Sequence, residues 1–450
     1  GRDAQGRRSL LTRFVGDDKT QLIISSSSFP IPEEMDTTSL PWVEVATMGL
    51  FSAQWVKGHE AEGGKQCLKI EEHPWHSSQR PYNAMVSRPF VTPPAAAEGA
   101  SAQAGGAEID AADVETHWSN LFLDALSSAV KTRTLCQGHV PTASSAGSNV
   151  AVLFSGGLDC TVIAALLHHQ LPPEDEIDLL NVCFDFPTHS SPDRLTALAS
   201  YYDLKREFPT RVWRFVLVNV HPDEVEMYQE HILHLISPMT SQMDFNIGAA
   251  FWFASRGRGF LHEDSVQQEA GTPCKTLSSP KPFLSCAKII FTGIGADEQL
   301  GGYARHYSAF HRFGGWSRLQ EELVLDTNRL WERNHGRDDR CISDHGKEAR
   351  YPFLDEEVVK LLASTPLWII TDPRKEKGVG DKSILRVLAK EMSLHSCMRL
   401  PKRAIQFGSR IAKQSAKRVK LANGKGSRNV KGTDVFDVKV TGSVVSKKDS

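Results

Sequence analysis

The feature that most restricts the fold is an alternation of strand-like and helix-like segments between residues 149 and 292. The strand-like segments cover residues 149–154, 177–184, 212–220 and 287–292, the first of them a short apolar run, and helix-like segments at 160–167, 194–202 and 223–236 separate them. Continuous apolar runs are typical of strands buried on both faces, and strands that alternate with helices form parallel sheets covered on both sides. We therefore predict an α/β domain with a parallel sheet.

A loop of small residues follows the first apolar run. Residues 155–159 read Ser-Gly-Gly-Leu-Asp, and a predicted helix begins directly after them. Ligands of open α/β sheets bind beyond the carboxyl ends of the strands, where a helix start offers unpaired N–H groups to an anion. The two glycines let the backbone approach phosphate oxygens closely. Asp159 would repel a bare phosphate, so its natural use is to hold Mg²⁺ that bridges phosphates.

Ser155 and Thr161 offer hydroxyl donors to the same ligand. The alternative is an ordinary tight turn between a strand and a helix, because Ser-Gly-Gly alone is a weak signal. The preceding apolar strand and the following Asp159 favour phosphate binding. The pattern GxxxxGK[ST] is absent from this loop, so it is not a Walker-type loop.

A second loop of small residues and carboxylates follows the strand-like segment at 287–292. Residues 292–298 read Thr-Gly-Ile-Gly-Ala-Asp-Glu, and Gly-Gly-Tyr follows at 301–303. Asp297 offers a second carboxylate to the same metal, whereas the alternative is that it only caps a helix. Two such loops at strand ends of one sheet favour a shared site. The residues expected to converge there are Ser155, Gly156, Asp159, Gly293 and Asp297.

The regions on either side of the predicted sheet differ in character. Residues 1–91 are β-rich, with strand candidates at 22–24 and 42–45, and the part up to about residue 416 is mainly helical after the sheet. A helix is predicted from Val114, with Asp113 as its cap. Its expected apolar face consists of Trp118, Leu121, Phe122, Ala125 and Ala129. The polar stretch at 257–282 is interpreted as a surface loop or insertion.

Composition and charge argue against several function classes. A net charge of −2 gives no reason to expect binding to nucleic acid or to a membrane surface. The sequence shows neither an apolar run long enough to span a bilayer nor a signal peptide. Eight cysteines are spread thinly without a CxxC pair, which is typical of reduced thiols. We therefore expect a cytoplasmic protein that binds neither nucleic acid nor membrane.

Together, the two loops resemble those of the asparagine synthetase family of ATP pyrophosphatases. Further resemblance lies in Ser-Pro-Asp at 191–193, in Glu-Ala-Arg-Tyr-Pro-Phe-Leu-Asp at 348–355 and in Asp-Lys-Ser-Ile-Leu-Arg at 381–386. Residues 1–10 are similar to the closing part of the family's glutamine amidotransferase domain. The resemblance covers most of the chain up to about residue 413.

The resemblance implies a domain organisation. An adenine nucleotide alpha hydrolase-like ATP-pyrophosphatase domain would be preceded by the β-rich end of a glutamine amidotransferase type 2 domain. The family's glutaminase nucleophile is an N-terminal cysteine that would lie upstream of Gly1, so we expect the chain to be a fragment. The expected segments are the amidotransferase-like part at 1–92, a flexible Ala/Gly/Ser-rich linker at 93–113, the synthetase domain at 114–416 and a disordered Lys/Gly/Ser-rich tail at 417–450.

Members of the family activate the side-chain carboxylate of aspartate with MgATP, release pyrophosphate and let ammonia displace AMP to give asparagine. The resemblance thus implies ATP and Mg²⁺ as cofactors, and aspartate with glutamine or ammonia as partners. By the same resemblance Asp159 and Asp297 hold the metal. The residues implied in binding ATP or pyrophosphate are Leu153, Ser155, Gly156, Gly157, Leu158, Asp159, Thr292 and Gly293.

Two positions depart from the family pattern. The second loop usually carries an acid where this chain has Ile294, and a lysine usually stands three residues before Phe407, where this chain has Ala404. Aliphatic side chains neither relay protons nor stabilise developing charge. Two interpretations stay open, an asparagine synthetase-like ATP-dependent ligase and an ATP-binding scaffold with little or no synthetase activity. A tRNA-modifying ATP pyrophosphatase would need a cysteine pair and a basic RNA surface, and neither is visible.

Overall fold

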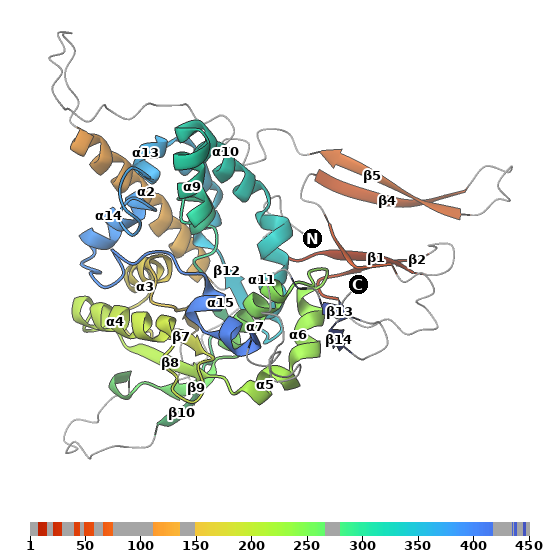
Figure 1. The fold of residues 1–450 in the computed structure, drawn as a ribbon, viewed down its shortest axis with the longest axis horizontal. Coiled ribbons are helices and arrows are strands. Elements are labelled where there is room, and N and C mark those ends of the chain that lie inside the picture. The colour runs from red at the N-terminus through yellow and green to blue at the C-terminus, as the bar shows by residue number, and fades with distance from the viewer. Residues whose placement is uncertain are drawn as a thin grey trace, which may run out of the picture.

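A seven-stranded sheet with helices on both faces forms the centre of the computed structural model (Figure 1). The structure describes residues 8–15, 21–28, 40–45, 49–57, 66–74, 111–135, 149–265, 280–416, 434, 436–438 and 444–446. The α/β class and the mostly parallel sheet predicted from the alternating segments are confirmed. None of the helices in this described part combines the length and apolar character needed to cross a membrane.

The strands of the sheet lie in the order β10-β9-β8-β7-β6-β11-β12. Their bounds are β6 Val150–Leu153, β7 Ile177–Cys183, β8 Trp213–Asn219, β9 Arg258–Leu261, β10 Lys281–Leu284, β11 Ile289–Phe291 and β12 Glu348–Arg350. Five neighbouring strands, β8, β7, β6, β11 and β12, pair in parallel. The strands β9 and β10 add an antiparallel edge beside β8. The strand β12 was not predicted, because a run of three residues is too short to show a period.

The polar stretch at 257–282 is not simply a surface loop, since its ends form β9 and β10. Gly257 ends the preceding helix with a φ of 66°, a conformation that glycine adopts without strain, and β9 begins at the next residue. A Cβ at Gly259 would lie 2.4 Å from the carbonyl oxygen of Leu217, so only glycine permits this close strand pairing. Residues 266–279 lie outside the described part.

Helices cover the two faces of the sheet and build two separate cores. One face carries α2 Ala111–Thr134, α3 Leu158–Gln170, α4 Pro192–Glu207, α12 Glu356–Ser364, α13 Leu367–Ile370 and α14 Ser383–Glu391. The other carries α5 Pro222–Met227, α6 Gln229–Ile236, α7 Gln242–Arg256 and α11 Gly336–Ser343. In β7, Leu179 belongs to the first core and Leu180 to the second, so helices cover both faces of this strand.

The remaining helices surround the carboxyl edge of the sheet. They are α8 Ala296–Gln299, α9 Ala304–Phe313, α10 Gly315–Asn328, the π-helical turn η4 Trp331–His335 and α15 Ile405–Gly408, with short 3₁₀ turns η3 Glu263–Ser265 and η5 Pro352–Leu354. The part after the sheet is therefore mainly helical, as predicted, apart from β12.

The helix predicted from Val114 begins earlier, at Ala111, inside the range expected for the linker. Asp113 consequently lies in the first turn and does not cap the helix. The expected apolar face is partly wrong, because Leu121 is 37% exposed while Phe122 is buried. The buried positions continue at Leu126 and Val130, which follow Phe122 at helical spacing. Residues 93–110 of the expected linker lie outside the described part.

The N-terminal region is β-rich, as predicted, wherever it is described. Strands β1 Leu11–Val15, β2 Gln21–Ser25 and β3 Val43–Glu44 form an antiparallel sheet, and β4 Gly49–Lys57 pairs with β5 Gln66–Pro74. The buried Arg340 of α11 joins the first of these sheets to the α/β domain, because it ion-pairs with Glu44 and donates to Oγ of Ser9 at 2.7 Å.

The expectation of a disordered tail at 417–450 is wrong for the residues that are described there. Strands β13 Phe436–Val438 and β14 Val444–Ser446 pair antiparallel. The backbone N–H of Phe436 donates to the carbonyl of Thr240 at 2.8 Å, and its ring lies 5.3 Å from that of Phe245. Phe436 therefore helps to dock the segment, which a composition averaged over Lys, Gly and Ser does not indicate.

Candidate functional site

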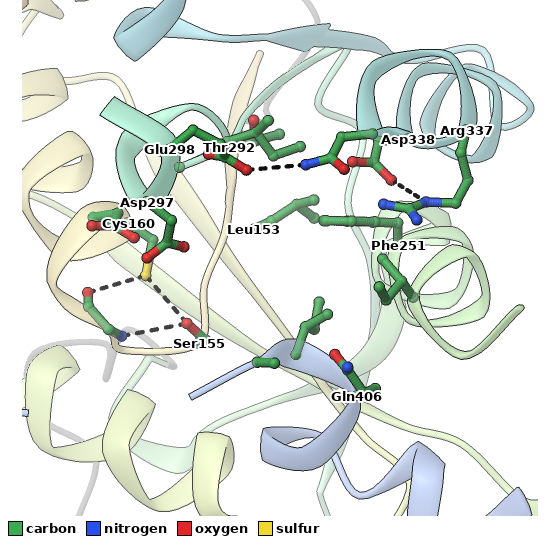
Figure 2. Close-up of a pocket in the computed structure, with 18 of the residues that line it drawn as sticks. Leu153, Ser155, Cys160, Phe251, Thr292, Asp297, Glu298, Arg337, Asp338 and Gln406 are labelled. Atoms are coloured by element: carbon green, nitrogen blue, oxygen red, sulfur yellow. Dashed lines mark hydrogen bonds and ion pairs between the residues drawn. The ribbon is translucent and has the colours of Figure 1, made fainter. Parts of the chain in front are cut away.

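A cavity of about 660 Å³ lies at the carboxyl edge of the sheet, where β6 and β11 end side by side (Figure 2). This volume is typical of small-molecule sites, which span roughly 300–1,000 Å³. Both predicted loops contribute to its lining. Of the residues implied by the family resemblance, those that line the cavity are Leu153, Ser155, Gly157, Asp159, Thr292, Gly293 and Asp297.

The first loop turns its acceptor groups away from the cavity. Hydroxyls of Thr196, Ser200 and Thr161 each donate at 2.8 Å, to the carbonyls of Ser155, Gly156 and Gly157 respectively. The buried Thr161 thus holds the loop and does not offer its hydroxyl to a ligand, contrary to expectation. With its carbonyls occupied, the loop is suited to an anion, which needs donors and not acceptors.

Gly156 and Leu158, which the resemblance also implies in ATP binding, contribute to the packing of this loop. Gly156 has a φ of 72°, and a Cβ there would lie 2.3 Å from Cα of Ala197, so α4 can pack against the loop only because the residue is glycine. Leu158 is 6% exposed and belongs to the core. No side chain caps α3 at Gly157, so the first N–H groups of the helix are available to a ligand.

Cys160 follows Asp159, and its side chain is buried beside the first loop. Its thiol donates to the carbonyl of Gly157 at 3.3 Å and lies 3.7 Å from Oγ of Ser155. Burial raises the pKa of this thiol above its usual value. Cys160 is therefore a neutral packing residue and not a nucleophile.

The second loop approaches the first closely. A Cβ at Gly293 would lie 2.7 Å from Cβ of Asp159, so glycine is needed where the two loops touch. The helix α8 begins after Gly295, which has a φ of 94°, and no side chain caps it. The alternative interpretation of Asp297 as a helix cap is therefore excluded.

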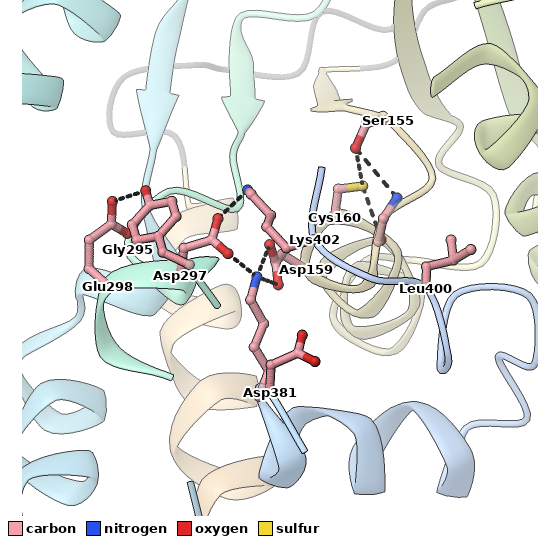
Figure 3. A network of polar contacts seen from close by, with 12 residues as sticks. Ser155, Asp159, Cys160, Gly295, Asp297, Glu298, Asp381, Leu400 and Lys402 are labelled. Carbon is pink, nitrogen blue, oxygen red and sulfur yellow. Dashed lines mark hydrogen bonds and ion pairs between the residues drawn. The ribbon is translucent and has the colours of Figure 1, made fainter. Parts of the chain in front are cut away.

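Lys382 lies between the carboxylates of Asp159 and Asp297. Figure 3 shows these two carboxylates as neighbours, with Lys402 beside them. Nζ of Lys382 is 2.7 Å from both oxygens of Asp159 and 2.7 Å from Oδ1 of Asp297. Lys402 forms an ion pair with Oδ2 of Asp297. Both carboxylates therefore face the same space, as expected from the placement of the two loops at neighbouring strand ends.

The two lysines set the charge state of this cluster. Burial alone would raise the pKa of Asp297, but Lys382 and Lys402 outweigh burial and hold this pKa well below its usual value. Burial likewise would lower the pKa of Lys402, and Asp297 with Asp159 instead raises it. Lys382 has a φ of 54°, a left-handed conformation that costs energy for a residue other than glycine. Sequence reasoning did not assign Lys382 to the site, although this lysine lies in one of the family-like segments.

The donor set at Asp159 and Asp297 fits Mg²⁺. Mg²⁺ is commonly held by one or two carboxylates, while substrate phosphates and waters supply its other ligands. Oδ1 of Asp297 is buried and makes no hydrogen bond of good geometry, and the Lys382 ammonium already lies where both carboxylates share a cation. Among the residues that the structure describes, no three metal-ligating side chains gather at one point, so phosphate oxygens would have to complete the site.

Glu298 is a buried acid that sequence reasoning did not assign to the site. It lines the cavity, and its Oε1 accepts from the Tyr303 hydroxyl at 2.6 Å and from Nδ2 of Asn334 at 3.1 Å. Burial and the charge of Asp297 raise the pKa of Glu298. Ile294 and Ala404, the two departures from the family pattern, also line the cavity.

Asp193, from the Ser-Pro-Asp segment, lines the cavity on the side of Lys402 and Arg403. Burial raises its pKa to about 7, against the lowering effect of Arg403 and Lys402. Its carboxylate packs against Gly408, where a Cβ would lie 2.0 Å from Oδ1. This carboxyl therefore titrates near neutral pH.

The free energy of unfolding of the wild-type protein should fall as pH rises, because Asp193 must then ionise in a buried place. We expect Asp193→Asn to abolish this contribution. The pKa of Asp193 is raised from 3.8 to about 7, so its contribution is favourable below pH 4 and is lost between pH 4 and 7. The full loss is up to about 4 kcal/mol. Denaturant unfolding of both proteins is measured at pH 5 and pH 8, without nucleotide. The free energy of unfolding of the variant, relative to that of the wild type, should be larger at pH 8 than at pH 5. An equal difference at both pH values would contradict this assignment.

Comparison with known proteins places the whole chain in a family. The sequence model of the family described as asparagine synthase matches residues 309–423. Asparagine synthetase domain-containing protein 1 from Homo sapiens is 34% identical over 503 residues, which cover 92% of this chain and 74% of that protein. Its counterpart from Bos taurus is 40% identical over 351 residues, 67% of this chain and 53% of that protein.

A protein named putative asparagine synthetase [glutamine-hydrolyzing] 1, from Methanocaldococcus jannaschii, is 28% identical over 220 residues, 48% of this chain and 33% of that protein. The chain spans about half the length of its cattle, mouse and chicken relatives. The sheet, the two loops and the long match to the human protein lead to one conclusion. This chain belongs to the asparagine synthase family, in the group of asparagine synthetase domain-containing protein 1.

Proposed function

We propose that this chain binds MgATP and uses it to adenylate the side-chain carboxylate of aspartate, in the manner of an asparagine synthetase. The observation that carries the proposal is the convergence of Asp159 and Asp297 on one ammonium beside the first loop. That loop has its carbonyls occupied and the start of α3 uncapped. A triphosphate with its metal is the ligand that matches two carboxylates next to an anion-binding loop.

The cavity offers a separate place for each part of ATP. Apolar side chains, among them Leu153, Ile247 and Phe251, form one region that suits the adenine ring. The pyrophosphate would bind at Ser155, Gly157 and the start of α3, with Lys382 and Lys402 supplying positive charge. Asp159 and Asp297 would hold Mg²⁺, which when bound neutralises charge on the departing pyrophosphate.

In the first proposed step, an oxygen of the aspartate side chain attacks the α-phosphorus of ATP, and the bond to pyrophosphate breaks. In the second, ammonia attacks the activated carbonyl carbon, the bond to AMP breaks, and the nitrogen loses a proton. The second step needs a proton acceptor and a donor to the developing oxyanion. Ile294 and Ala404 supply neither, so the second candidate function is an ATP-binding scaffold with little or no synthetase activity.

Pyrophosphate release distinguishes the two candidates. We expect the full chain with MgATP to release pyrophosphate faster when L-aspartate is added, because adenylation needs the carboxylate as its nucleophile. The control is L-asparagine, in which an amide replaces that nucleophile. MgATP binding without any aspartate-dependent release would support the scaffold and contradict adenylation.

A further inference from the structure

One wall of the cavity has no role in the adenylation proposed above. It consists of the end of α10, the π-helical turn η4 and the start of α11, and it contributes Arg329, Arg333 and Arg337 to the lining. Figure 2 shows Arg337 and Asp338 on the opposite side of the cavity from Ser155, with Leu153 and Phe251 between them. A π-helical turn inside a helical segment is rare and recurs at functional sites.

Two guanidinium groups on this side are already neutralised. Arg337 is buried, with Nη1 2.7 Å from Oδ1 of Asp244 and Nε 2.7 Å from Oδ1 of Asp338. Arg305, on the neighbouring α9, donates from Nε to Oδ2 of Asp326 at 2.7 Å. These pairs satisfy both arginines within the protein, so neither is available to a ligand without breaking an ion pair.

Arg329 and Arg333 differ from these two. Both are exposed, both line the cavity, and they stand four residues apart, so their side chains can act together. Within the described ranges neither has a carboxylate within 4.0 Å, and Glu332 on the same turn forms no ion pair with them. Within the described part of the chain, this wall therefore presents two guanidinium groups to the cavity that no carboxylate of the protein pairs with.

We propose, building on the adenylation function above, that Arg329 and Arg333 form a subsite for the acceptor's second carboxylate, the one that is not adenylated. An acceptor such as aspartate carries two carboxylates, and only one of them reacts. The other keeps its charge throughout and needs a counter-charge away from the phosphates. Guanidinium groups bind carboxylates through paired hydrogen bonds. The phosphates already have Lys382, Lys402 and the start of α3.

The test is calorimetric titration of the full chain, saturated with a non-hydrolysable MgATP analogue. L-Aspartate is compared with β-alanine, which is aspartate without the α-carboxylate. The variant is the double substitution Arg329→Gln and Arg333→Gln, and the matched control is Arg312→Gln. Arg312 is exposed on α9 and does not line the cavity, so this control removes a similar surface charge.

We expect the double variant to bind aspartate about 10- to 100-fold more weakly, as for loss of charged hydrogen bonds, with β-alanine unaffected. Its affinity for the nucleotide should stay within about twofold of the wild type, and Arg312→Gln should change nothing. Arg329→Lys with Arg333→Lys should restore part of the aspartate affinity, because charge is kept without the paired geometry.

Three results would overturn the proposal, and they differ in what else they overturn. Unchanged aspartate affinity in the double variant rejects the subsite alone. A loss of nucleotide affinity equal to that of aspartate means that the arginines bind a phosphate. A wild-type chain that binds the nucleotide but neither aspartate nor β-alanine rejects the adenylation function together with its subsite.

Discussion

Asparagine production by this chain, with saturating ammonia and aspartate, should be roughly a hundred- to a thousandfold slower than that of a comparable family member. Such a member carries an acid at the position of Ile294 and a lysine at the position of Ala404. Loss of one charge-stabilising contact typically has this effect on a transition state. Ile294 and Ala404 line the cavity, so the two departures lie where the reaction would occur. Saturating ammonia bypasses any need for a glutaminase site, and asparagine is measured directly by amino-acid analysis.

The double substitution Ile294→Glu and Ala404→Lys provides the complementary test. It should raise asparagine production while leaving the rate of aspartate-dependent pyrophosphate release within a fewfold, because adenylation does not need the two introduced groups. Lys402 stands two residues before Ala404 and pairs with Asp297, so taking the place of the missing lysine would require this ion pair to break. Wild-type turnover equal to that of an ordinary asparagine synthetase would show that Ile294 and Ala404 are not limiting.

Asp159→Asn should weaken MgATP binding by about 10- to 100-fold, since one charged ligand of the metal is lost at constant volume. The same substitution frees Lys382 from one of its two carboxylates. Binding of ATP without Mg²⁺ should therefore be unchanged or tighter. Calorimetric titration with ATP in excess Mg²⁺ and in a chelator separates these two effects.

Asp113→Asn is a matched control for this experiment. Asp113 also lies in the first turn of a helix, but it is exposed and does not line the cavity. It should leave both affinities unchanged. If Asp159→Asn affects ATP equally with and without Mg²⁺, or has no effect at all, Asp159 serves only to pair with Lys382. The melting temperature of each variant shows whether the fold is kept.

Much of the architecture follows from local sequence patterns. In a strand such as β6, Val150 and Ala151 belong to different cores, so both faces are apolar and the continuous apolar run is visible in the sequence itself. The two loops were also predictable, because glycines followed by a carboxylate directly after such a strand restrict the backbone and the chemistry together. Local patterns of this kind predicted the mostly parallel sheet, the two loops at its edge and the helical region that follows.

The tertiary structure alone decided which charges meet. Lys382 and Asp159 are 223 residues apart and Lys402 and Asp297 are 105 apart, so no local pattern indicates either pair. The same holds for Glu298, whose partner Asn334 comes from a π-helical turn that has no sequence period of its own. Short edge strands such as β12 form because a neighbouring strand offers hydrogen bonds, not because of their own residues. Patterns along the chain therefore identified the loops, whereas long-range packing placed Lys382 and Lys402 between them and brought Arg329 and Arg333 to the same cavity.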